Sequence, residues 1–200
     1  MNTSYRLSFF HAINDNLYQD GLDRINEANH PLGPCLGVEI GVHHGKLSAF
    51  LLRKFPGLHL TLVDPWKEWG DDDRYRLAGH RIANEDQDAN YRLAMETVAP
   101  YVDRTDVMRM LSIEAADYVA NGSLDFVIID GDHSEEGCWE DMEAWYPKVR
   151  FGGVLMGHDY GRRKWGVKKA VNRFVEERCL DLQVHPKSVW ACPIPTPIPA

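Results

Sequence analysis

The feature that most constrains the fold is an alternation, repeated five times, of a short, mainly apolar run with a stretch of helical periodicity. The apolar runs are Leu36–Ile40, His59–Val63, Val107–Leu111, Leu124–Ile129 and Val154–Gly157. The run Leu124–Ile129 ends in four consecutive large apolar residues, without the alternation of a half-exposed strand. Strands that are apolar on both faces are typical of parallel sheets covered on both sides. The sequence therefore predicts an α/β fold: one domain with a Rossmann-like, doubly wound, mostly parallel sheet and helices on both faces.

Helical spacing of apolar residues predicts the segments that cover this sheet. The expected helices are Lys46–Lys54, Glu114–Val119, Glu135–Tyr146 and Trp165–Cys179, with one more around Tyr91–Val98. Sheets of this kind bind ligands just outside the carboxyl ends of their strands. Polar residues that directly follow a strand are therefore the candidates for function.

Three regions lie outside the alternating pattern. Residues 1–34 predict an N-terminal helical segment that ends at two prolines, and residues 35–191 then form the Rossmann-like domain. Residues 67–103 are a long, acid-rich insertion, expected to be a lid, a substrate wall, a partner surface or a loop. Residues 192–200 carry proline at every second position from 193 to 199, which predicts an extended coil rather than a central strand.

Composition excludes several classes of partner. The 200 residues carry 30 acidic and 22 basic side chains, a net charge of −8. This charge repels phosphate backbones, so we expect no nucleic-acid partner. The basic run that begins at Arg162 is interpreted as the solvated start of a helix. The longest apolar runs have four residues, so no membrane span or membrane partner is expected.

Cysteine usage and the N-terminus indicate the compartment. Four cysteines stand far apart, without the paired spacing of a zinc or redox motif. The first fifteen residues lack the apolar core of a signal peptide. We therefore expect a reduced, cytoplasmic protein.

The loop after the first predicted strand combines an acid with two glycines. Gly41 and Gly45 let the backbone turn sharply and come close to a ligand. The dinucleotide pattern would have a further glycine at position 43, where this chain has a histidine. Glu39, two residues before Gly41, favours a cationic ligand over a pyrophosphate. The adjacent His43 and His44 are interpreted as loop residues rather than as ligands.

The loop after the second predicted strand supplies a second acid. Asp64 lies 19 residues beyond Gly45, at a strand end where a carboxylate can accept hydrogen bonds from a ribose diol. Trp66 could lie against an adenine ring or simply fill the core, and the sequence does not separate these two roles.

Together with these loops, three further segments resemble the class I S-adenosyl-L-methionine-dependent methyltransferases, in particular their small O-methyltransferase-like branch. The segments are Met110–Ala116, Leu124–Ser134 and Gly152–Tyr160. The resemblance spans residues 36–178 and implies S-adenosyl-L-methionine as the cofactor. The cofactor-binding residues that it implies are Glu39, Gly41, Gly45, Asp64, Trp66, Ser112 and Asp130.

Five polar side chains follow the fourth and fifth predicted strands: Asp130, Asp132, His133, His158 and Asp159. Neighbouring strand ends bring such residues to one edge of the sheet. By resemblance to metal-dependent O-methyltransferases, Asp130, His158 and Asp159 are the candidate metal ligands, although those relatives usually have an acid in place of His158. Mg²⁺ or Mn²⁺ is favoured, with Fe²⁺ and Zn²⁺ left open. The structural alternative is that Asp130 binds loop amides, His158 packs, and Asp132 caps the next helix.

These observations favour a methyltransferase that acts on the hydroxyl group of a small molecule, with or without a metal. Without a metal, His133 or Asp130 would be the catalytic base. The alternatives are a nicotinamide-dependent oxidoreductase, for which Asp64 is also suitable, and a metal hydrolase. A further alternative is a non-catalytic binding module that forms a homodimer through residues 4–29 and 67–103.

Overall fold

The computed structural model of the chain describes residues 35–68, 70, 85–161, 166–185 and 188–196. The predicted N-terminal helix, most of the segment 67–86, the start of the basic run and the last four residues of the chain lie outside the described residues. No helix in the described part of the chain combines the length and apolarity that a membrane crossing requires.

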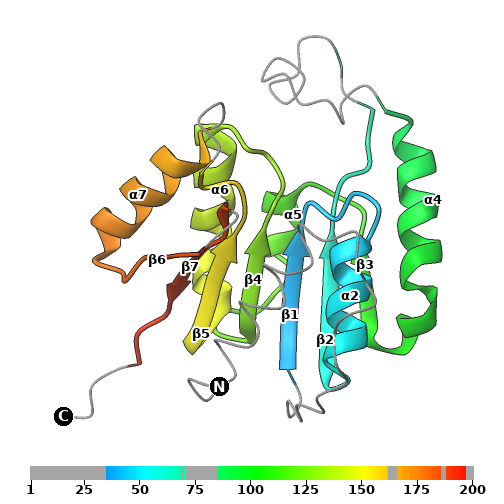
Figure 1. The fold of residues 1–200 in the computed structure, drawn as a ribbon, viewed down its shortest axis with the longest axis horizontal. Helices are drawn as coiled ribbons and strands as arrows, with labels where there is room; N and C mark the ends of the chain where they lie inside the picture. Colours follow the sequence, from blue (N-terminus) through cyan, green and yellow to red (C-terminus); the bar gives the residue numbers. More distant parts are fainter. Residues whose placement is uncertain (1–34, 69, 71–84, 162–165, 186–187, 197–200) are drawn as a thin grey trace.

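The described residues form one sheet of seven strands in the order β3-β2-β1-β4-β5-β7-β6 (Figure 1). The strands are β1 (Cys35–Ile40), β2 (Leu58–Val63), β3 (Thr105–Met108), β4 (Leu124–Ile129), β5 (Val149–Gly157), β6 (Gln183–Val184) and β7 (Trp190–Pro193). Strands β1 to β5 are parallel, whereas β7 pairs antiparallel with both β5 and β6. The chain order reverses between β1 and β4, and this junction is where such sheets bind ligands. The predicted fold class is confirmed.

Helices pack on both faces of the sheet because consecutive strand residues point to opposite sides. The helices are α2 (Lys46–Lys54), α4 (Gln87–Val98), α5 (Ser112–Ala116), α6 (Glu135–Trp145) and α7 (Val167–Arg178), with 3₁₀ turns at Ala99–Arg104 and Tyr146–Lys148. Phe126 and Ile128 of β4 pack in a core cluster with α2 and α4. Val127 and Ile129 of the same strand pack in a second cluster with α5, α6 and α7. The apolar run of β4 is therefore buried on both of its faces.

The third strand and the helix after it begin earlier than predicted. The strand β3 is Thr105–Met108 instead of Val107–Leu111, and α5 begins at Ser112 instead of Glu114. Pairing with β2 fixes this register, since Thr105 lies opposite Leu60 and Met108 opposite Val63. As the outer strand, β3 buries little of its surface, so its own side chains give only a weak pattern.

The prediction of a coil from residue 192 onward is wrong for the first residues of that segment. Cys192 and Pro193 belong to β7, which lies inside the sheet between β5 and β6. The amide of Ile194 donates to the Gly153 carbonyl, so the backbone nitrogen of Pro193, one residue earlier, faces away from β5. Along β7, the pairing with β6 extends only as far as Ala191. The nitrogen of Pro193, which carries no hydrogen, therefore does not have to donate a hydrogen bond to β6.

Candidate functional site

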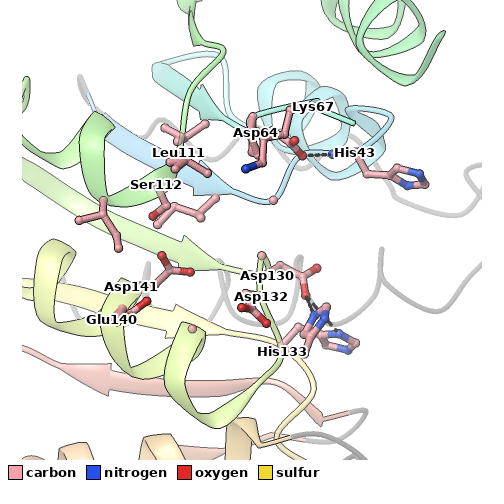
Figure 2. Close-up of a pocket in the computed structure, with 18 of the residues that line it drawn as sticks. His43, Asp64, Lys67, Leu111, Ser112, Asp130, Asp132, His133, Glu140 and Asp141 are labelled. Carbon is pink, nitrogen blue, oxygen red and sulfur yellow. Dashed lines mark hydrogen bonds and ion pairs between the residues drawn. The ribbon is translucent and has the colours of Figure 1, made fainter. Parts of the chain in front are cut away.

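A cavity of about 650 Å³ opens at the carboxyl ends of the parallel strands. Asp64, Lys67, Leu111 and Ser112 lie on one wall, after β2 and β3 (Figure 2). The opposite wall carries Asp130, Asp132, His133, Glu140 and Asp141, which belong to α6 and to the loop before it. The predicted site residues that line the cavity are Gly41, Asp64, Ser112, Asp130, His133, His158 and Asp159. Three other predicted site residues, Glu39, Gly45 and Trp66, are not among the described residues that line the cavity.

The carboxylate of Asp64 is held rigidly at the end of β2. Its Oδ2 accepts the amide of His43 at 2.9 Å, and its Oδ1 accepts the amide of Trp66 at 2.8 Å. Burial raises the pKa of Asp64, and these backbone hydrogen bonds oppose that rise. A third backbone hydrogen bond, from Val42, also reaches this carboxylate, which leaves a lone pair that can accept from a ligand in the cavity.

Gly41 lets the first loop pass directly over the end of β4. Its φ is +83°, and a Cβ at this position would lie 2.2 Å from the carbonyl oxygen of Asp130. The amide of Asp130 in turn donates to the Ile40 carbonyl. Gly45, with a φ of +72°, forms the turn that starts α2 and contacts α4 rather than the cavity.

Glu39 lies behind the first loop, where only 2% of its surface is exposed. Its Oε2 accepts the hydroxyl of Ser48 on α2 at 2.5 Å. The expected direct contact between this acid and a cationic ligand is therefore not what the structure presents. Because consecutive strand residues point to opposite faces, Glu39 faces α2, and its hydrogen bond joins β1 to that helix.

The burial of Glu39 leads to a prediction about pH. Desolvation raises the pKa of its carboxyl from 4.5 to about 8, although the Ser48 hydrogen bond opposes the rise. As pH increases through this range, the unfolded chain releases the proton while the folded protein retains it. The free energy of unfolding should therefore fall as pH rises, by on the order of a few kcal/mol in total.

Glu39→Gln should flatten this dependence and stabilise the protein at pH 8, because the amide can still accept from Ser48. The measurement is urea unfolding at several values between pH 5 and pH 8. The control is Glu96→Gln at an exposed position of α4. Equal slopes for wild type and Glu39→Gln would show that Glu39 is ionised across the whole range.

Trp66 fills the core. Its side chain is 1% exposed, its Nε1 donates to the His43 carbonyl at 2.8 Å, and its ring meets Tyr91 edge-on. Of the two roles left open for Trp66, the structure favours packing. Ser112 lines the cavity as expected and accepts a hydrogen bond from Nε1 of Trp145 at 2.8 Å.

Sequence interpretation missed the side chains that α6 contributes to the cavity. Gly137, Glu140 and Asp141 all line it, and Asp141 is 5% exposed. These positions are three and four residues apart, so they share one face of a helix. Gly137 faces Asp132 in the neighbouring loop. The spacing from Gly137 could therefore have placed Glu140 and Asp141 on the cavity side.

The side chain of His133 lies between two carboxylates at the ends of β4 and β5. Its Nε2 is 3.1 Å from Oδ1 of Asp130 and 3.1 Å from Oδ2 of Asp159. The three residues offer ligand atoms within 4.8 Å of one another. His158 borders this group, with its Nδ1 3.2 Å from Asp159 and 3.9 Å from Asp130. We call Asp130, His133 and Asp159 the rim cluster.

The rim cluster favours a charged imidazole. Burial by itself would lower the pKa of His133, but the hydrogen bond to Asp130 and the charges of Asp130 and Asp159 outweigh it, so the pKa is raised. Asp132 has a different role, because its Oδ1 accepts the amide of Ser134, whose own hydroxyl caps α6. The N-cap of α6 is thus Ser134 and not Asp132, whose carboxylate instead holds the backbone amide of Ser134.

The structure is that of an α/β protein with a cavity at the carboxyl edge of its sheet, the edge at which such sheets bind ligands. A family described as a methyltransferase domain matches residues 38–160, which is more than half of the chain. The chain belongs to this family, and the methyltransferase resemblance seen in the sequence is confirmed.

One curated protein is similar to this chain in sequence. A curated relative from Sinorhizobium fredii, an uncharacterized protein named y4gI, is 28% identical over 138 residues. The match covers 68% of this chain but 14% of the relative, so the chain spans about one seventh of the relative's length.

Solved structures share the fold at low sequence identity. An O-methyltransferase from Bacillus cereus in complex with SAH has a TM-score of 0.55 at 17% identity, covering 79% of this chain and 73% of that one. A methyltransferase from Geobacter sulfurreducens has a TM-score of 0.59 at 14% identity, covering 98% and 80% of the two chains. The O-methyltransferase TomG from Streptomyces achromogenes, solved with SAM, has a TM-score of 0.54 at 13% identity, covering 80% and 73%.

Proposed function

We propose that this methyltransferase uses S-adenosylmethionine and transfers its methyl group to a hydroxyl of a small molecule. The observation that carries the proposal is the placement of two sites across one cavity. A rigid acid, Asp64, lies at the end of β2, and the rim cluster lies at the ends of β4 and β5. The solved O-methyltransferases with SAH and SAM support the choice of cofactor.

The first loop and Asp64 would bind the nucleoside part of the cofactor. The backbone amides that hold Asp64 leave a lone pair that can accept from a ribose hydroxyl. The wall after β3 also carries Leu111, Ser112 and Ile113. Ser112 would supply a hydroxyl, and the other two would supply apolar surfaces, for the adenine ring of the cofactor. The Gly41 backbone, which carries no side chain, permits the close approach that such a ligand needs.

The rim cluster would act on the methyl acceptor. Methyl transfer is an in-line displacement, so the protein has to hold the acceptor oxygen about 3 Å from the methyl carbon and remove its proton. Nε2 of His133 donates toward both carboxylates, so Asp130 is the group that would take that proton, and the charged imidazole of His133 would hold Asp130 and Asp159 in place. His133 and Asp130 are the residues proposed as the base from the sequence.

The donor set of the rim cluster also fits a divalent metal. Two carboxylates and one imidazole, with ligand atoms within 4.8 Å, match the preferences of Mg²⁺, Mn²⁺ and related ions. Asp130 and Asp159 would hold such an ion, with His133 or His158 as the third ligand. When bound, it would lower the pKa of the acceptor hydroxyl and orient it.

The cofactor assignment predicts the behaviour of Asp64→Asn. This variant keeps the size of the side chain but removes the charge, so S-adenosylhomocysteine should bind about 10- to 100-fold more weakly. Isothermal titration calorimetry of wild type and variant gives the two dissociation constants. The control is Asp106→Asn on the exposed face of β3, which should leave the affinity unchanged.

Two results would contradict the proposal. One is the absence of measurable heat with wild type at millimolar S-adenosylmethionine or S-adenosylhomocysteine. The other is tighter binding of NADH than of either ligand, which would favour the oxidoreductase alternative. Circular dichroism of Asp64→Asn checks that a loss of affinity does not come from unfolding.

A further inference from the structure

A second group of metal-ligand side chains lies in the loop between β1 and α2. His43 and His44 are adjacent, and their rings stack at 3.6 Å between centroids with 21° between the planes. Consecutive side chains of an extended strand point to opposite sides. Here His43 adopts a φ of +52°, and the two imidazoles lie side by side. Ring nitrogens of His43 and His44 therefore lie close to each other.

A carboxylate from the segment just before α4 meets these rings. Oε2 of Glu85 lies 2.8 Å from Nε2 of His43, and Nδ2 of Asn90 donates to the same oxygen at 3.0 Å. Oδ1 of Asn90 lies 2.9 Å from Nε2 of His44. The four side chains thus form one connected group between two segments that are about forty residues apart in the chain.

We propose that His43, His44 and Glu85 form a binding site for a transition-metal ion of the Zn²⁺ type, separate from the rim cluster. Their ligand atoms all lie within 4.8 Å of one another. Two imidazoles with one carboxylate are a donor set that Zn²⁺ binds readily, with the remaining position left to water. The side chains of His43 and Glu85 are 33% and 41% exposed, so both the ion and a water molecule can reach the site.

The movements needed to close the site are small. Tetrahedral Zn²⁺ with ligands at about 2.0–2.1 Å holds neighbouring ligand atoms about 3.4 Å apart. Nε2 of His43 and Oε2 of Glu85, 2.8 Å apart, would therefore separate by about 0.6 Å, and the other ligand atoms would approach by at most about 1.4 Å. Asn90, 7% exposed, keeps its hydrogen bond to Glu85 and orients that carboxylate.

Binding at this site would attach the segment just before α4 to the first loop. The backbone amide of His43 also holds Asp64, so the ion would stiffen the part of the loop that borders the cavity. A ligand that binds only the folded state raises its stability. We therefore expect Zn²⁺ to raise the midpoint of thermal unfolding, and we expect this rise to depend on His44 and Glu85.

The test is a titration of tag-free protein with Zn²⁺ alone, against a chromophoric chelator. To remove the rim cluster, the titration is done in an Asp130→Asn, Asp159→Asn background as well as in wild type. The background should bind one Zn²⁺ per chain. Adding Glu85→Gln or His44→Ala should weaken that binding by more than about 100-fold, beyond the usual cost of altering only a supporting residue.

The matched control is His59→Ala, which breaks a histidine–aspartate pair of the same 2.8 Å length on the exposed β3 side of the sheet. It should leave Zn²⁺ affinity unchanged. If the background variant does not fold, the same comparison is made in wild type, where Glu85→Gln should remove one bound equivalent. The proposal is overturned if folded Glu85→Gln and His44→Ala proteins bind Zn²⁺ as tightly as their parent, or if the parent binds none at millimolar Zn²⁺.

Discussion

Gly41→Ala should lower the free energy of unfolding by about 2–5 kcal/mol and abolish ligand binding in the cavity. Two costs add at this position. An alanine with a φ of +83° pays about 1–2 kcal/mol for the left-handed backbone. Its Cβ would also lie 2.2 Å from the Asp130 carbonyl oxygen and 2.7 Å from Cα of Gly131. Both are backbone atoms, so the loop or the end of β4 must move, at a further cost of about 1–3 kcal/mol.

Gly122→Ala separates these two costs. Gly122 has a φ of +66°, but nothing lies within 4 Å of a Cβ built there, so only the backbone cost of about 1–2 kcal/mol applies. Urea unfolding gives both changes, and calorimetry with S-adenosylhomocysteine gives the loss of binding. If the two variants are destabilised equally, the close contact between the first loop and β4 does not hold the site together.

The strands and helices that could be predicted are those whose burial leaves a pattern in their own side chains. Leu124–Ile129 is buried on both faces and was predicted with the bounds that the structure gives. The helix Lys46–Lys54 was likewise predicted residue for residue, because its apolar face packs on the sheet. The outer strand β3 and the strand β7 take their positions from partners distant in sequence. The residues of β3 therefore did not specify its register, and the residues of β7 did not reveal that a strand is present there.

The same distinction applies to the site. Position after a strand was enough to place Asp64 and the rim cluster at the cavity, since all strand ends of a parallel sheet share one edge. It was not enough to say which way a side chain points. Glu39 and Trp66 belong to the right segments, yet Glu39 faces α2 and Trp66 faces the core. The partners that turn them, Ser48 and Tyr91, come from helices that pack only in the folded chain.

Asp159→Asn should lower the rate of methyl transfer by at least about 100-fold while leaving the affinity for S-adenosylhomocysteine within about threefold. Asp159 is 4% exposed, contacts both His133 and His158, and has a φ of +62°. Asparagine tolerates this left-handed backbone and matches aspartate in size, so the change removes little besides the charge. His133 then loses one of the two carboxylates that hold it beside Asp130, the proposed base.

The measurement is release of S-adenosylhomocysteine with a panel of small hydroxylated acceptors, using the acceptor that wild type methylates fastest. Asp106→Asn, which weakens the corresponding pair with His59 away from the cavity, is the control and should retain full activity. Addition of a chelator to wild type separates the two ways in which Asp159 can act. Loss of activity with the chelator, restored by Mg²⁺ or Mn²⁺, assigns Asp159 to a metal ion, whereas full activity assigns it to His133 alone. An Asp159→Asn protein that methylates its acceptor at the wild-type rate would exclude both roles, because neither a bound ion nor a charged imidazole at this position could do without the carboxylate.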